Sequence, residues 1–299
     1  MNRPTIGFIG VGLMGHCMAK NIVEKGYPLV VMGHRNRGPV EHLVTLGARE
    51  AQTPRELAAQ CDIVHLCVTG SPQVEALLRG QNGDGQGVIA SARQGLIVID
   101  CSTSNPVSTL ALGDELKAAG MTLVDAPLSR TPKEAEAGTL DTMVGADAAT
   151  FARIKPVIEC WATTINHLGP LGLGHKMKLV NNFVAMGYAA LYAEALAIAR
   201  RAGLSIEQFH AVLGAGRMRC GFYDTFMKWT IEHDPNAHKD MRYLASMANE
   251  AGAVNTLQAG VKNSFAAMEA AGQGARYVPM LADFIAGLNG LPAAADAKD

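Results

Sequence analysis

Short apolar runs and longer amphipathic stretches alternate along the first half of the chain. Each run has three to six residues, and segments long enough for a helix separate the runs. This pattern is typical of buried parallel strands joined by helical crossovers. It predicts strands over Thr5–Ile9, Leu29–Met32, Ile63–Val68, Leu96–Ile99, Met121–Val124 and Thr142–Val144.

The second half has no such runs. It opens with a glycine-rich stretch at 169–174 and then becomes almost wholly helix-like. From His175 to about Arg201 apolar residues occupy nearly every face, which predicts one long helix buried on all sides. At about 1.5 Å per residue this helix would be roughly 40 Å long.

The first predicted strand is followed by Gly10-Val11-Gly12-Leu13-Met14-Gly15, and a helix-like stretch comes next. In a strand–turn–helix context, the pattern G-x-G-x-x-G binds the pyrophosphate of a dinucleotide. The glycines permit a tight turn, close approach of the phosphate and close packing of helix on strand. The alternative is a glycine turn without a ligand.

We therefore predict an α/β, doubly wound, Rossmann-type domain over 1–165. An all-α domain for substrate binding and oligomerisation follows over 166–290, with the cleft between the two domains. Residues 291–299 are expected to form a disordered tail.

The end of the second predicted strand indicates which dinucleotide binds. NAD-binding chains usually carry an acidic residue there for the ribose hydroxyls. This chain has Gly33-His34-Arg35-Asn36-Arg37 and no carboxylate in that segment. His34, Arg35 and Arg37 could meet the 2′-phosphate of NADPH/NADP, so we predict that cofactor. Arginines that only solvate a surface loop are the alternative.

Lys178 and Asn182 lie near the start of the long predicted helix. They are four residues apart and share one face, whereas Lys176 lies about 200° round from Lys178. A lysine kept on an apolar helix is costly to desolvate, and burial lowers its pKa toward the range useful for proton transfer. A lysine that simply reaches water at a solvated helix end is the alternative.

Composition narrows the class of protein. The 299 residues are 48% hydrophobic and 18% charged, with a net charge of −1, so a basic footprint for nucleic acid is not expected. The six cysteines have no metal-ligand spacing, and no metal site is expected. The N-terminus lacks a signal-peptide pattern, and no uninterrupted apolar run of roughly 18 residues is present. We expect a cytoplasmic globular protein that binds no membrane.

Several segments together resemble the signature set of the β-hydroxyacid dehydrogenases, which include 3-hydroxyisobutyrate dehydrogenase and tartronate semialdehyde reductase. The similar segments are Gly7–Gly15, Asp100-Cys101-Ser102-Thr103, Asp125-Ala126-Pro127-Leu128-Ser129, the segment from Gly172 to Asn182, and Lys239-Asp240-Met241.

The resemblance implies a role for each matching residue. Lys178 would be the general acid/base, Asn182 would orient the substrate, and Ser129 would hold the acid group of the substrate. Ser102 and Thr103 would lie beside the nicotinamide. Further cofactor contacts are expected at Val68, Thr69 and Lys239. A dimer or tetramer built through the helical domain is also implied.

Two departures from the family pattern matter. Most members follow the serine with two glycines, whereas this chain has Arg130-Thr131, which is more similar to the sulfolactaldehyde reductase branch. The stretch 233–238 before Lys239 is shorter than in the family, which puts the geometry of Lys239 in doubt. Arg217 and Arg219 could also reach the cleft.

The expected reaction is hydride transfer from NADPH to the carbonyl of a small anionic 2- or 3-oxo acid. Ser129, Arg130 and Thr131 would bind its anionic end, and a 2-oxoalkylphosphonate or a sulfonate is the preferred head group. One alternative is action on carboxylates, as in 3-hydroxyisobutyrate dehydrogenase or tartronate semialdehyde reductase. Imine reduction and cofactor binding without turnover are the others, and Lys178 argues against both.

Overall fold

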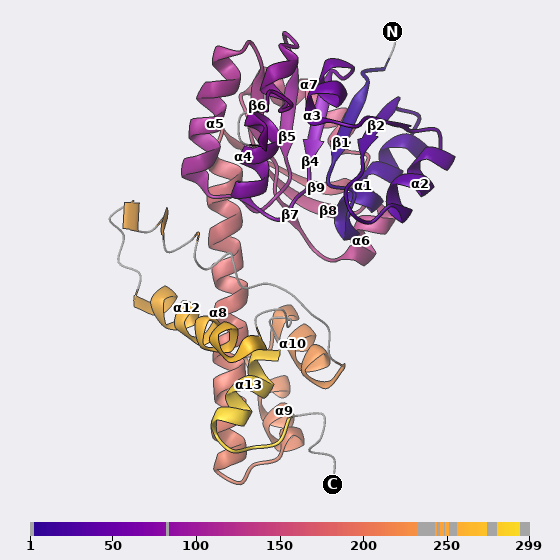
Figure 1. Ribbon diagram of the computed structural model, residues 1–299. Helices are drawn as coiled ribbons and strands as arrows, with labels where there is room; N and C mark the ends of the chain where they lie inside the picture. Colours follow the sequence, from indigo (N-terminus) through magenta and orange to yellow (C-terminus); the bar gives the residue numbers. More distant parts are fainter. Residues whose placement is uncertain are drawn as a thin grey trace. The chain divides into compact units, whose positions relative to one another are not determined.

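The computed structural model describes residues 3–81, 84–232, 243, 246–247, 249–250, 256–273 and 280–293. The chain divides into two compact units, Met1–Lys178 and Leu179–Asp299 (Figure 1). The long helix α8 (Leu173–Arg201) begins in the first unit and continues in the second. The expected boundary near residue 166 stays a prediction.

The described part of the first unit contains a sheet of nine strands in the order β3-β2-β1-β4-β5-β6-β8-β7, with β9 paired to β8. The order turns back between β1 and β4, which is the switch point where doubly wound sheets bind ligands. The strands are β1 (Ile6–Ile9), β2 (Leu29–Met32), β3 (Arg49–Glu50), β4 (Ile63–Leu66), β5 (Ile97–Asp100), β6 (Thr122–Asp125), β7 (Leu128–Ser129), β8 (Leu140–Gly145) and β9 (Ala162–Gly169).

All six strands expected from the sequence are present, but the sheet is not wholly parallel. Strand β8 runs antiparallel to β6 and β7, and β9 then pairs parallel to β8. Strands β3, β7 and β9 were not expected. Strands β3 and β7 have only two residues each. In β9 half of the eight residues are exposed and only Ala162 is buried, so none of the three forms an apolar run.

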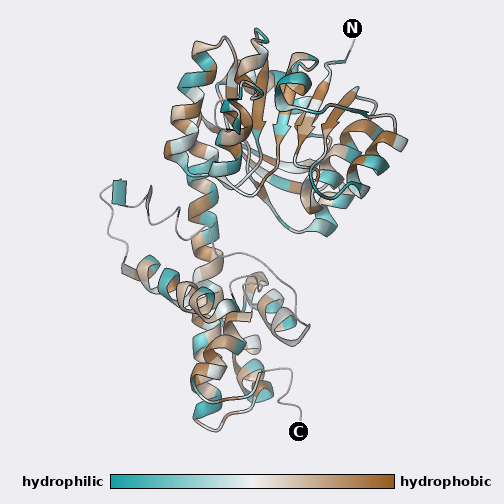
Figure 2. Cartoon of the chain, viewed as in Figure 1, coloured by the Kyte–Doolittle hydropathy of each residue, from teal (hydrophilic) through white to brown (hydrophobic). Residues whose placement is uncertain are grey.

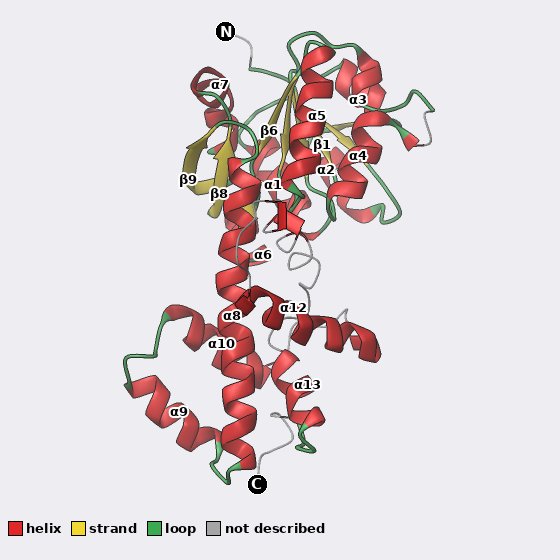
Figure 3. Ribbon diagram, turned by 90° about the vertical axis from the view of Figure 1, so that its left-hand side faces the viewer, coloured by secondary structure: helices red, strands yellow, loops and turns green. Residues whose placement is uncertain are grey.

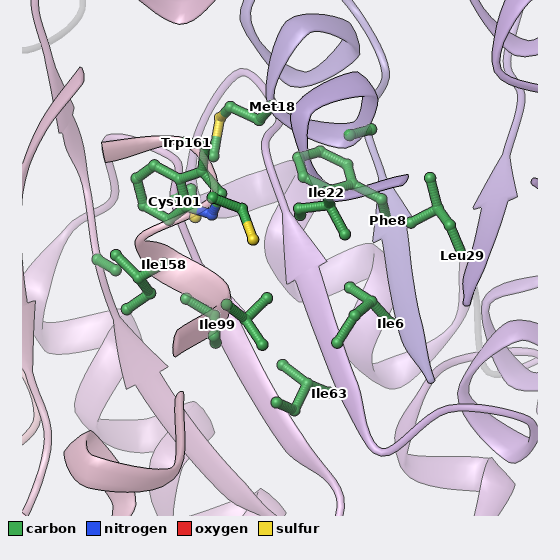
Figure 4. Packing of buried hydrophobic residues seen from close by; sticks show 14 of the residues in the cluster. Ile6, Phe8, Met18, Ile22, Leu29, Ile63, Ile99, Cys101, Ile158 and Trp161 are labelled. Carbon is green, nitrogen blue, oxygen red and sulfur yellow. The ribbon is translucent and has the colours of Figure 1, made fainter. Parts of the chain in front are cut away.

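Helices cover both faces of this sheet because side chains alternate between the faces along each strand. One apolar cluster joins Ile6, Phe8 and Ile99 to helices α1, α2 and α7 (Figure 4). A second cluster joins Val30, Val64 and Val98 to α3, α4 and α5, which lie together in Figure 3. The helices are α1 (Leu13–Glu24), α2 (Gly38–Thr45), α3 (Pro54–Ala59), α4 (Ser71–Arg79), α5 (Pro106–Ala118), α6 (Pro132–Ala137) and α7 (Ala148–Ile158), with a 3-10 turn at Ile89–Ser91.

The described part of the second unit is helical. Leu179, Met186 and Leu196 of α8 pack with residues of the other helices in one core. Those helices are α9 (Ile206–Ala215), α10 (Gly221–Glu232), α12 (Thr256–Met268) and α13 (Leu281–Leu288), with a π-helical turn at Glu269–Gln273. Of the expected tail at 291–299, residues 294–299 lie outside the described residues.

Helix α8 confirms the long helix, but the expectation that it is buried on all sides is wrong. Val184, Leu191 and Ile198 are 51%, 61% and 64% exposed. Brown, apolar stretches recur along this helix in Figure 2. By length and composition α8 could span a membrane, although 44% of its most apolar window is buried inside the protein. Core helices of soluble proteins pass the same test, so this is weak support for a membrane span.

His65 is an unusual member of the first core. It lies on β4, is fully buried, stacks on Phe8 with ring centroids 5.4 Å apart, and meets the edge of Trp161. Neither ring nitrogen has a hydrogen-bond partner among the described residues. Burial lowers the pKa of His65 from 6.5 to about 3, so the folded protein holds it neutral.

This buried imidazole predicts a loss of stability in acid. Below pH about 6.5 His65 is protonated in the unfolded chain but stays neutral in the folded chain. The free energy of unfolding therefore falls progressively as the pH drops toward 3. When the pH is lowered from about 7.5 to 4.5, this histidine should reduce the free energy of unfolding by about 2–3 kcal/mol. His65→Leu should remove that part of the loss in urea unfolding at the two pH values.

Ile99→Val is the control, because Ile99 pairs with His65 in the sheet and lies in the same core. It should lower stability by about 1 kcal/mol equally at both pH values. An unchanged pH dependence in His65→Leu would contradict the prediction.

Candidate active site

The glycine turn after β1 has the geometry of a phosphate cradle. Gly10 has a φ of +95°, and a Cβ there would lie 2.2 Å from the carbonyl oxygen of Cys67. A Cβ on Gly15 would lie 2.0 Å from the carbonyl oxygen of Gly10. Gly10 and Gly15 are therefore required for the turn and for packing α1 on the sheet.

Gly12 differs from the other two glycines. No described atom lies within 4 Å of the place its Cβ would take, and no side chain caps the first turn of α1. Leu13 beside it is 73% exposed, and Met14 is half-buried. Open space and uncapped N–H groups at a helix N-terminus fit the pyrophosphate of a dinucleotide.

The loops after β4 and β5 lie next to this turn, because β1, β4 and β5 are parallel neighbours. The backbone N–H of Val68 donates to Oγ of Ser102 over 3.0 Å, so this hydroxyl ties the two strand ends together. Ser102 is 3% exposed, whereas Thr69 is exposed and Thr103 half-buried. Thr69 and Thr103 are thus better placed than Ser102 to meet a cofactor.

A carboxylate from a neighbouring strand lies beside the end of β2, and the local sequence does not reveal it. Glu50 on β3 pairs with both Nη atoms of Arg37 at 2.6 and 2.7 Å. The hydrogen bonds between the two side chains lower the pKa of Glu50 and raise the pKa of Arg37. The segment at the end of β2 has no carboxylate of its own, but the neighbouring strand β3 places one beside Arg37.

His34 and Arg35 are both exposed. Arg35 makes no hydrogen bond or ion pair within the described part of the chain. It is therefore the more available of the two arginines for a 2′-phosphate.

A buried polar network holds the first turn of α8. Both carboxylate oxygens of Asp125, at the end of β6, accept backbone N–H groups, from Gly172 at 2.8 Å and His175 at 2.6 Å. A carboxylate at this position caps the helix and complements its dipole. Burial raises the pKa of Asp125, although His175 and the backbone donors favour its charged form.

His175 extends this network to β5 and α5. Its Nε2 donates to the carbonyl of Ser102 over 3.1 Å, and its Nδ1 lies 2.8 Å from Oγ1 of Thr109. The fully buried ring stands 3.7 Å from Asp100 and 3.8 Å from Asp125. The turn that precedes Lys178 is thereby fixed to two strand ends.

Lys178 follows His175 by three residues and is half-buried, and Asn182 on the same helix is also half-buried. They keep the shared face that their spacing predicts. Lys176 is exposed.

The three side chains of the Ser129-Arg130-Thr131 segment lie in different environments. Oγ of Ser129 is shielded from solvent and has no hydrogen-bond partner among the described residues. Both the backbone N–H and the hydroxyl of Thr131 donate to Glu134 in the capping box of α6. Thr131 therefore has a structural task, whereas Arg130, with its side chain 49% exposed, can reach a ligand.

Other expected residues lie elsewhere. Lys239 and the stretch 233–238 lie outside the described residues. In the second unit Arg217 is exposed, and Arg219 pairs with Asp224 at 2.9 Å. Within the described ranges, no group of three or more His, Cys, Asp or Glu side chains is placed to hold a metal.

Sequence reasoning gave no role to Asp100, Asp125, His175, Glu50 and Asp141, although the first three lie in the family-like segments. For Asp100 and Asp125 a signal existed, because each directly follows a predicted apolar strand, where ligand-binding residues of parallel sheets gather. Glu50 and Asp141 depend on which strands become neighbours, and His175 on how α8 packs against the ends of β5 and β6.

An open phosphate cradle at the switch point, with parallel strand ends beside it, is typical of a dinucleotide-binding domain of the Rossmann type. Residues 5–169 match the family described as the NAD binding domain of 6-phosphogluconate dehydrogenase. Residues 172–280 match the one described as the NAD-binding of NADP-dependent 3-hydroxyisobutyrate dehydrogenase. The chain belongs to the β-hydroxyacid dehydrogenase family, and it is an NAD(P)-dependent oxidoreductase acting on CH–OH groups of small hydroxy acids.

Individual relatives agree with this assignment. The chain is 35% identical to 2-hydroxy-3-oxopropionate reductase of Escherichia coli over 71% of its length and 70% of that protein. It is 29% identical to 3-sulfolactaldehyde reductase of the same organism, over 90% of this chain and 91% of that one. The structure of Mycobacterium tuberculosis 3-hydroxyisobutyrate dehydrogenase with L-serine is similar, with a TM-score of 0.84, 25% identity, and coverage of 95% and 99%.

Proposed function

We propose that the protein is an NADPH-dependent reductase for a small 2- or 3-oxo acid with a sulfonate or phosphonate head group. The observation that carries the reaction is the placement of Lys178 and Asn182 on one face of α8, directly after a turn anchored by Asp125 and His175. The relatives named reductases support this direction of reaction.

The residues divide the work as follows. Gly10, Gly12 and Gly15 shape the turn that would hold the pyrophosphate, and Thr69 and Thr103 would stand beside the nicotinamide. When bound, the reduced nicotinamide supplies the hydride. Lys178 gives a proton to the alkoxide oxygen that forms, and its positive charge stabilises that oxygen as negative charge develops.

Asn182, one turn further along the helix, donates its amide N–H to the same oxygen and orients the substrate. Exact placement of these two groups relative to the carbonyl sets the rate. Arg130 binds the anionic end of the substrate, because a guanidinium offers two parallel donors to a tetrahedral oxyanion.

Replacement of the proton donor tests the proposed reaction. Lys178→Ala should lower kcat by about two to four orders of magnitude, the usual contribution of a general acid, with little change in NADPH affinity. NADPH oxidation with matched carboxylate, sulfonate and phosphonate oxo acids measures this loss. The same panel should give the highest kcat/KM with a sulfonate or phosphonate.

Lys176→Ala is the matched control, since this exposed lysine is on another face of the same helix. Its kcat should stay close to that of the unaltered protein. Near-normal turnover of Lys178→Ala at neutral pH would assign the proton to another residue. Turnover of cyclic imines but no oxo acid would favour imine reduction.

We propose that Arg35 provides the preference for NADPH, because Arg37 is partly neutralised by Glu50. Arg35→Asp should move the ratio of kcat/KM for NADPH over NADH toward NADH. Glu50→Gln should raise the same ratio severalfold, since it releases the charge of Arg37.

Arg49→Asp is the control, because Arg49 lies beside Glu50 on β3 and bonds Gln60 instead. It should leave the ratio nearly unchanged. Equal or better use of NADH by the unaltered protein would contradict the proposed preference.

The exposed apolar face of α8 supports a homo-oligomer. Val184, Leu191 and Ile198 recur every seven residues. Val180, one turn before Val184, and Tyr188, between Val184 and Leu191, are 42% and 41% exposed. A seven-residue apolar repeat is the pattern with which helices pack against a second helix. We propose that a second copy of this chain covers this face, as a dimer or a larger assembly built on it.

Leu191→Glu with Ile198→Glu should shift the mass measured by sedimentation equilibrium toward the monomer. Leu257→Glu on α12, 70% exposed and outside this face, should leave the mass unchanged. A monomeric unaltered protein that co-sediments with lipid vesicles would contradict the proposal and favour a membrane partner.

We also propose a cytoplasmic location. Cys17, Cys61, Cys101 and Cys160 are buried thiols that pack as apolar side chains, as is usual in a reducing compartment.

A further inference from the structure

Arg130 has a backbone conformation that its residue type disfavours. Its φ is +86°, in the left-handed region where glycine is usual, and among the described non-glycine residues only Ala92 shares a positive φ. A side chain in this conformation costs free energy, and such strain persists at functional sites when surrounding contacts hold it.

An ion pair holds the Arg130 side chain. Its Nε donates to Oδ2 of Asp141 over 2.7 Å, and the two side chains are 49% and 24% exposed. No described residue accepts from Nη1 or Nη2 of Arg130. Because Asp141 occupies Nε, the edge formed by the two Nη atoms is the one left for an anion.

The ion pair also lowers the positive potential of this segment. Asp141 pairs with Ser129 across β7 and β8, and neither its Oδ1 nor Oγ of Ser129 has a hydrogen-bond partner among the described residues. Glu134 also interacts with Arg130 and adds a second negative charge. The anion site around Arg130 is therefore less positive than an isolated guanidinium would make it.

The charge of the head group decides how strongly Asp141 opposes its binding to Arg130. A carboxylate held across the width of a guanidinium repels a dianion twice as strongly as a monoanion. We propose that Asp141 is a specificity-determining residue that holds down the affinity for doubly charged head groups, so that the site selects a singly charged tetrahedral anion such as a sulfonate. This inference rests on the proposed contact between Arg130 and the head group.

The experiment compares two simple probes, methanesulfonate and methylphosphonate, at pH about 8.5, where the phosphonate carries two charges. Titration calorimetry of the NADP-loaded protein gives both dissociation constants without requiring turnover. Asp141→Asn should increase the affinity for methylphosphonate relative to methanesulfonate by about three- to tenfold, because one repelling charge at short range is removed.

Two variants control for shape and for a general change in charge. Asp141→Glu keeps the negative charge and should keep the ratio of the unaltered protein. Asp62→Asn removes a carboxylate from a similar exposed ion pair, with Arg93, just before β4 at the opposite end of the strands, and should also keep the ratio. A ratio unchanged in Asp141→Asn, or changed equally in Asp141→Glu, would overturn the inference.

Arg130→Gly separates this inference from the proposed function. Glycine accepts a φ of +86°, so the melting temperature should not fall, whereas binding of both probes should weaken at least tenfold. If Arg130→Gly binds both probes as before, the proposed head-group contact fails. If only the Asp141→Asn ratio fails to move, that contact stands and charge selection by Asp141 is wrong.

Discussion

The capping of helix α8 by Asp125 is the interaction on which the arrangement of the site depends. A carboxylate fully withdrawn from water is costly, and it is kept here because two backbone N–H groups of the first turn and the ring of His175 surround it. This approach is possible only because glycines stand on both sides. A Cβ on Gly145 would lie 2.1 Å from Oδ1 of Asp125, and one on Gly174 would lie 2.3 Å from the carbonyl oxygen of Met143. The helix therefore begins at a place that the sheet defines.

The consequence for the site is that the turn before Lys178, the proposed proton donor, and the loops after β4 and β5 share one support. His175 contacts the carbonyl of Ser102, and Ser102 in turn accepts from Val68, so a continuous chain of hydrogen bonds joins the ends of β4 and β5 to the turn before Lys178. Groups held in this way lose little freedom when a substrate binds, which is the condition for efficient proton and hydride transfer. The buried hydroxyl of Ser102 therefore links the ends of β4 and β5 and is not exposed for a direct contact with a cofactor.

The parts of the molecule that local sequence predicts are those in which neighbours in sequence make the structure. The glycine turn, the apolar strands and helix α8 are of this kind, and all of them are present. Strand β9 escaped prediction because half of its residues are exposed and only Ala162 is buried. Its pairing with β8 holds it in the sheet without an apolar pattern. Glu50 beside Arg37, and Asp141 beside Arg130, could not be foreseen because each pair joins different strands or loops. The apolar side chains of α8 were recognised, but several of them are exposed, and hydropathy alone does not tell which apolar residues of a helix are buried.

Arg37 and Arg130, two of the arginines singled out from the sequence, are each paired with a carboxylate in the same way. Arg37 follows β2 and pairs with Glu50 on β3, and Arg130 follows β7 and pairs with Asp141 on β8. In both cases the carboxylate comes from the adjacent strand, fixes the orientation of the guanidinium and reduces its net charge. Ion pairs this exposed contribute little to stability. Their effect on an incoming anion is larger, because the same charges that orient a donor also set the local potential. Selectivity at such a site is therefore a property of the pair, and the identity of the arginine alone is not sufficient to define the ligand.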